Sequence, residues 1–171
     1  MRVLRFFLAL VAALVVHLVL VGAEPQASRV FDPFLIVIVL QAMRGDIVFA
    51  MVSGALVGLT QDAVSGGLYG LHGFAGTVVG YVLAGAVRFL SLQKFYYVIL
   101  FFAAAVLVKE IVVQLLFVAL LRRPEVPLLD DLVLQVVLAG LVGAAAVATV
   151  ETLSQRLSAW RRSRRPRVSL E

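Results

Sequence analysis

Cysteine is absent from the 171-residue chain. Disulfide bonds, thiolate catalysis and cysteine-based metal sites are therefore excluded. The sequence also lacks a nucleophile elbow, a phosphate-cradling loop beside a nucleotide site and a pair of acids at a defined spacing. These absences argue against an enzyme, and we expect no bound cofactor.

What the chain has in abundance is apolar residues, which make up 63% of it. Soluble domains are about 45–50% apolar, so this composition predicts a membrane protein with several spans. Several apolar runs are long enough to cross a hydrocarbon core of ~30 Å, and no room is left for a separate soluble domain. The net charge of +5 does not indicate nucleic-acid binding, because the basic residues fall in loops and in the tail, where they report membrane topology.

The first apolar run extends from Phe6 to Val21 and follows Arg2 and Arg5. A cleaved signal peptide is one interpretation, since Val21-Gly22-Ala23 loosely resembles a cleavage site. The run is long for a signal peptide and many more apolar runs follow it. We therefore favour an uncleaved first span.

Asp32-Pro33 is typical of a helix start, with an N-cap followed by the first helical residue. Two short apolar runs follow, residues 34–43 and 47–60, separated by Arg44-Gly45-Asp46. One long helix would place Arg44 in mid-membrane at a cost of at least ~2.5 kcal/mol, so a hairpin is favoured. Its short arms imply local thinning, tilt or protein cover.

The remaining predicted spans are residues 71–89, 95–121 and 128 to about 150. With six spans and both termini in the cytoplasm, eleven basic residues lie inside and three outside: inside are Arg2, Arg5, Arg44, Arg88, Lys94 and six tail arginines, and outside are Arg29, Arg122 and Arg123. A five-span arrangement leaves Arg44 in the membrane, so the positive-inside rule favours six. We predict a transmembrane domain over residues 1–155 and a basic cytoplasmic tail over residues 156–171, which can also touch anionic membrane lipids.

Glycines concentrate between the third and fourth predicted spans. The stretch GLTQDAVSGGLYGLHG, from Gly58 to Gly73, contains five glycines, an aspartate and a histidine. It predicts a tightly packed turn, since glycine permits positive φ and close backbone approach. Small residues spaced four apart let membrane helices approach closely, and the pairs are Gly54 and Gly58, Gly66 and Gly70, and Gly76 and Gly80.

The six-span topology gives each polar residue within the spans a depth. The residues that fall in one outer layer are His17, Asp62, His72, Lys109, Glu110, Gln114 and Gln135, whereas Gln41 lies toward the inner side. Ionisable groups in a membrane usually pair or face a cavity, and Asp62 or Glu110 could neutralise Lys109. The layer is a polar pocket, a docking site for another membrane helix, or an internal network that fixes helix packing. The network is favoured because buried polar groups are ordinarily hydrogen-bonded, and ligand spacing for a metal site of His17 and His72 is lacking.

The run GALVGLTQDAVSGGLYGLHGFAGTVVGY, from Gly54 to Tyr81, resembles the signature of the rod shape-determining protein MreD family. That signature has a glycine-bearing span, an aspartate, a Ser-Gly or Gly-Gly turn, a leucine-x-Gly step and a following apolar helix. The residues that fit it are Asp62, Gly66, Gly70 and Tyr81.

Chain length, the six-span layout, Glu110 in the fifth span and the stretch from Arg123 to Glu125 extend the resemblance over most of the chain. Only the central motif is specific. Lys109 departs from the apolar neighbour that the family pattern predicts beside Glu110, which leaves the partner of Glu110 open.

The resemblance implies an all-α integral protein of the bacterial inner membrane with six transmembrane helices, similar to the S-components of energy-coupling-factor transporters. It implies a non-enzymatic scaffold of the cell-elongation machinery that binds the transmembrane segment of MreC, in a complex with MreB, RodA and a class B penicillin-binding protein. The alternative is an S-component-like subunit that binds a small molecule for a vitamin transporter.

Overall fold

The computed structural model describes residues 2–23, 31–66, 68–89 and 95–121, together with residues 133, 134, 136–143, 145 and 147–149. Every regular element in this part of the chain is a helix: α1 (Arg2–Ala23), α3 (Pro33–Ala42), α4 (Ile47–Ser65), α5 (Leu71–Ala86) and α6 (Phe95–Leu121). The predicted all-α class is therefore confirmed. The predicted tail, residues 156–171, and Gln135 lie outside the described residues.

Three helices are long and apolar enough to cross a membrane, namely α1, α4 and residues Tyr97–Leu120 of α6. Shorter apolar helices are α3, α5 and Val136–Thr149, the last with residues 144 and 146 outside the described part. A ten-residue helix such as α3 rises only ~15 Å, about half of the hydrocarbon core. The structure thus supports a membrane protein, while the count of six spans stays a prediction.

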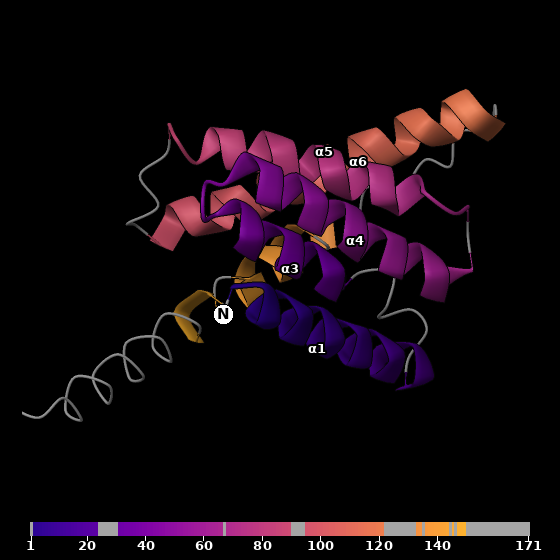
Figure 1. Cartoon of the computed structure of the whole chain (residues 1–171), viewed down its shortest axis with the longest axis horizontal. Helices are drawn as coiled ribbons and strands as arrows, with labels where there is room; N and C mark the ends of the chain where they lie inside the picture. The colour runs from indigo at the N-terminus through magenta and orange to yellow at the C-terminus, as the bar shows by residue number, and fades with distance from the viewer. Residues whose placement is uncertain are drawn as a thin grey trace, which may run out of the picture.

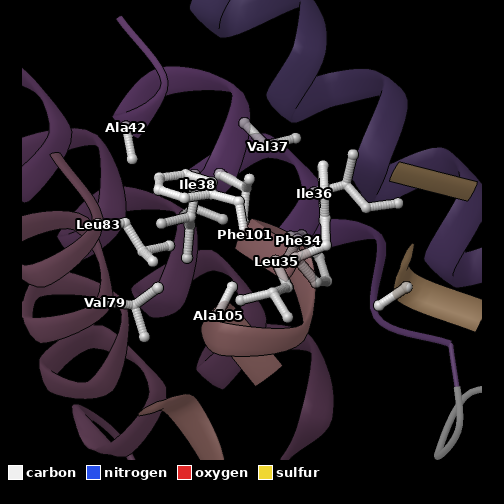
Figure 2. Close-up of a cluster of buried hydrophobic side chains, with 14 of the residues drawn as sticks. Phe34, Leu35, Ile36, Val37, Ile38, Ala42, Val79, Leu83, Phe101 and Ala105 are labelled. Atoms are coloured by element: carbon white, nitrogen blue, oxygen red, sulfur yellow. The ribbon is translucent and has the colours of Figure 1, made fainter. Parts of the chain in front are cut away.

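Helix α3 lies at the centre of the bundle, in contact with α1, α4, α5 and α6 (Figure 1). Nine of its ten residues are buried. Figure 2 shows Phe34, Leu35 and Ile38 of α3 among side chains of α5 and α6, including Leu83 and Phe101. Protein, rather than lipid, therefore covers the helix that is too short to span.

The predicted hairpin at Arg44-Gly45-Asp46 is confirmed. Helix α3 ends at Ala42, and α4 begins at Ile47 after Asp46, whose side chain accepts a hydrogen bond from the Phe49 backbone N–H at 3.1 Å. Gly45 has a φ of 71°, which glycine adopts without steric cost. The exposed side chain of Arg44 thus stays at the end of the bundle instead of inside a span.

Helices α4 and α5 approach so closely that side chains are excluded from their contact. A Cβ added to Gly58 would lie 2.0 Å from the His72 carbonyl oxygen, and one added to Gly54 would lie 2.1 Å from the Gly76 carbonyl oxygen. A Cβ on Gly80 would meet the backbone of Ala50. Four of the glycines expected to serve helix packing, Gly54, Gly58, Gly76 and Gly80, therefore lie in this one contact.

Gly66 and Gly70 have a different role from the one their spacing predicted. Neither has an atom within 4 Å of an added Cβ, so neither brings two helices together. Their φ angles are 64° and 93°, and they flank the turn between α4 and α5 as the C-cap of α4 and the N-cap of α5. Glycine is required at these positions by the positive φ of the backbone and not by close packing of neighbouring atoms.

Candidate functional site

The polar groups gather around a cleft at the end of the bundle where α4 turns into α5. The cleft has a volume of about 480 Å³ and is lined by His17, Val21, Asp32, Gln61, Val64, Ser65, His72, Lys109, Glu110 and Val113. These residues come from α1, α4, α5, α6 and the start of α3. Four of the predicted outer-layer residues, His17, His72, Lys109 and Glu110, are thus brought together although they are distant in sequence.

Lys109 pairs with Asp32, which corrects the expectation that Asp62 or Glu110 neutralises it. The Lys109 ammonium donates to Asp32 Oδ2, and both side chains are almost fully buried. Lys109 also donates to Gln61 Oε1 at 3.2 Å, while Gln61 Nε2 donates to the same Asp32 oxygen at 3.4 Å. A closed triangle of polar groups therefore satisfies the buried ammonium.

Asp32 also caps the N-terminus of α3. Its Oδ1 accepts hydrogen bonds from the backbone N–H groups of Phe34 and Leu35 at 3.0 and 3.2 Å. One carboxylate oxygen therefore serves the helix and the other serves Lys109. The sequence pattern predicted the cap but missed the pairing, because an N-cap aspartate is usually a surface residue and nothing local points to a lysine 77 positions away.

Asp62 closes the turn between α4 and α5 from inside. Its side chain is 1% exposed. Oδ2 accepts from the backbone N–H groups of Gly70 and Gly73 at 2.9 and 3.1 Å, and Oδ1 accepts from the His72 N–H at 3.0 Å. The carboxylate thus satisfies three amides at the start of α5, which has no local side-chain cap.

The two histidines of the predicted layer differ in surroundings. The ring N–H at Nδ1 of His72 donates to Asp62 Oδ1 over 2.8 Å, so that ring belongs to the turn network. The His17 ring is buried, and its centre lies 5.2 Å from the Phe34 ring centre. No group of three or more potential metal ligands occurs among the described residues.

The remaining predicted polar residues do not all lie at the cleft. Glu110 lines the cleft, whereas Gln114, one turn further along α6, is half-buried and is not among the lining residues. Gln41 lies on α3 and is buried, with its Oε1 unpartnered. Gln61 joins the site without having been predicted, and the signal that could have found it is its position beside Asp62 at the end of an apolar helix.

Two neighbouring polar networks therefore define the site. One joins Asp32, Gln61 and Lys109, and the other joins Asp62 and His72 to the backbone of the turn. Both networks hold helices together, and the cleft beside them exposes both hydrogen-bonding and apolar groups. Such a surface suits a small polar ligand or a partner helix.

Comparisons of the chain with protein-family models, with curated proteins and with solved structures found no match.

Proposed function

We propose that this chain is a non-enzymatic scaffold of the bacterial cell-elongation machinery that binds the transmembrane segment of MreC. The proposal starts from the resemblance of residues 54–81 to the MreD family signature. MreB, RodA and a class B penicillin-binding protein are the further partners that the resemblance implies. The protein acts by positioning these partners in the inner membrane.

The proposal rests on the closely packed helix pair that residues 54–81 form. The glycines bring α4 and α5 into backbone contact, and Asp62 locks the turn between them. The acid of the signature is therefore buried and bonded to the backbone of the turn. A rigid helix pair of this kind supports a docking role, since a scaffold must present its partners with a fixed surface.

We infer the docking surface from the groups that packing leaves accessible. Four glycines are used in the contact between α4 and α5, and the Asp62 carboxylate is enclosed, so none of these groups is open to a partner. The mouth of the cleft remains, where Val21 of α1 and Val64 of α4 are exposed beside the paired charges. We place the MreC helix at this mouth, in contact with apolar side chains and with the polar groups behind them.

The test replaces an exposed residue of the cleft without touching the buried networks. Val64→Trp fills the mouth, and Val52→Trp is the matched control, because it lies on the same helix, is exposed and does not line the cleft. Val64→Trp should abolish co-purification of MreC and rod-shape complementation, while Val52→Trp should retain both. Retention of both activities by Val64→Trp would place docking elsewhere.

The second candidate function is an S-component-like carrier, and the cleft itself favours it. Its volume of about 480 Å³ falls within the range of ~300–1,000 Å³ that is typical of small-molecule sites. A carrier retains a solute through purification and requires an ATPase module, which a scaffold does not. Mass spectrometry of extracts from the pure protein and from Val64→Trp separates the two functions: a solute lost in the variant identifies a carrier, and MreC capture without solute identifies a scaffold.

A further inference from the structure

Arginines gather at the opposite end of the bundle from the cleft. Arg2 and Arg5 lie in the first turns of α1, and Arg44 lies in the turn between α3 and α4. Both α1 arginines are close enough to lower the pKa of the Arg44 guanidinium, after the larger effect of its partial burial. A fourth arginine, Arg88, follows α5 beside this turn, because Val87 lies 4.0 Å from a Cβ built on Gly45.

These arginines carry more positive charge than the adjacent protein neutralises. Within the described residues, the only ion pair that they make joins Arg2 Nη1 to Asp46 Oδ2 at 2.8 Å. The other two guanidinium nitrogens of Arg2, Nε and Nη2, have no hydrogen-bond partner, and the group lies 4.1 Å from the centre of the Phe49 ring. The stacked guanidinium is thus held in place with most of its N–H donors unused.

A membrane span that begins at Arg2 places the cluster at the depth of the lipid headgroups. Helix α1 is long and apolar enough to span the membrane and begins at Arg2, while α4 begins just after Asp46. Arginine binds phosphate through paired N–H donors. The excess of arginine here is typical of the cytoplasmic side, where the leaflet carries anionic lipid.

We propose that Arg2, Arg5 and Arg44 form a binding site for the phosphate of an anionic phospholipid. The Arg2 side chain is 40% exposed, but its unpartnered Nε and Nη2 are buried beside Phe49, so a headgroup phosphate reaches them only when the guanidinium turns away from that ring. Exposed Arg5 and Arg44 approach the phosphate from α1 and from the α3–α4 turn. This lipid site goes beyond the proposed function, because it does not depend on whether the protein is a scaffold or a carrier.

The experiment compares phosphatidylglycerol with phosphatidylcholine on the full-length protein in a neutral detergent. Thermal unfolding is followed by circular dichroism, and retained lipid is counted by native mass spectrometry. Phosphatidylglycerol should raise the Tm and be retained, whereas phosphatidylcholine should do neither. Arg44→Gln should weaken phosphatidylglycerol retention about fivefold, the effect of one basic residue near an anionic surface.

Arg44→Gln also separates lipid binding from a structural role. Arg44 makes no ion pair among the described residues and is repelled by Arg2 and Arg5. The variant should therefore match or exceed the wild-type Tm without lipid, yet lose the lipid-dependent rise. Arg29→Gln, on the predicted outer side, is the charge-matched control and should retain lipid like wild type.

Four results would overturn the proposal. The first is an equal Tm rise with phosphatidylcholine, and the second is equal loss of retention in Arg44→Gln and Arg29→Gln. The third is an equal rise with inorganic phosphate alone, which would show a soluble anion as the ligand. A cluster that instead captures an acidic protein would leave phosphatidylglycerol retention unchanged in Arg44→Gln, and that result also contradicts lipid binding.

Discussion

Two aspartates perform the same tasks at opposite ends of α3 in very different surroundings. Asp32 caps α3 and pairs with Lys109 of α6, while Asp46 caps α4 and pairs with Arg2 of α1. The side chains of the first pair are 9% and 6% exposed, and those of the second are 43% and 40% exposed. Both pairs join a carboxylate to a cation, but they differ in burial. The buried pair is held within the packing of the bundle, whereas the attraction in the exposed pair is screened by the surrounding medium.

The larger cost falls on the buried pair. We expect Lys109→Ala to destabilise the protein by about 3–5 kcal/mol, because it leaves the Asp32 carboxylate enclosed without its cation. The equivalent change at the exposed pair, Arg2→Ala, should cost far less. Unfolding of both variants in a detergent titration with sodium dodecyl sulfate measures the difference.

The double variant Asp32→Asn/Lys109→Met sharpens this comparison. Asparagine retains the N-cap of α3, and methionine fills the volume of the lysine stem without a charge. The double variant should therefore recover most of the stability lost in Lys109→Ala. Equal losses in Lys109→Ala and Arg2→Ala would show that burial does not distinguish the pairs.

Asp62 is a third aspartate that caps a helix. It lies on α4 and accepts hydrogen bonds from the start of the next helix, α5. Asp62→Ala removes the acceptor for three backbone N–H groups and for His72, so we expect a loss of about 3 kcal/mol. Asp62→Asn keeps one acceptor oxygen and should lose less. Thermal unfolding of the two variants provides the measurement. An unchanged Tm in Asp62→Ala would show that the Asp62 carboxylate does not stabilise the start of α5.

The close contact between α4 and α5 depends on the absence of side chains at its glycines. Gly58→Ala places a methyl group against a backbone carbonyl and should cost about 2 kcal/mol through forced separation of α4 and α5. Gly85→Ala is the control, since a Cβ there meets nothing within 4 Å. Side-by-side thermal melts should show a lower Tm for Gly58→Ala alone; equal melts would contradict the close contact.

The smallest effect is expected at the exposed pair, and it depends on pH. The Phe49 N–H and then Arg2 hold the pKa of the Asp46 carboxyl below its ordinary value of 3.8. The charged form is therefore favoured in the folded protein, so its stabilisation is present above about pH 4 and is lost as the pH falls through the lowered pKa. Asp46→Asn should remove this part of the acid sensitivity, which a pH series of Tm values against wild type detects.

The fold was predictable where the signal is local. The apolar run at residues 95–121 predicted α6 to the residue, and Arg44-Gly45-Asp46 predicted the hairpin, because a mid-membrane arginine is costly. The site was predictable only in part. Depth along the spans indicated that His17, His72 and Lys109 share a layer, but depth carries no information about which faces of the helices meet.

The sequence by itself determined the all-helical class, the position of the hairpin and the need for the buried charges to find partners, since these follow from hydrophobic runs and the cost of burying charge. Only the tertiary structure decided that Lys109 pairs with Asp32, that Asp62 closes a turn, and that Gly66 and Gly70 provide conformation rather than contact. Rotation of each helix about its axis selects these partners. That rotation is fixed by packing against α3 and by the backbone contact of α4 with α5.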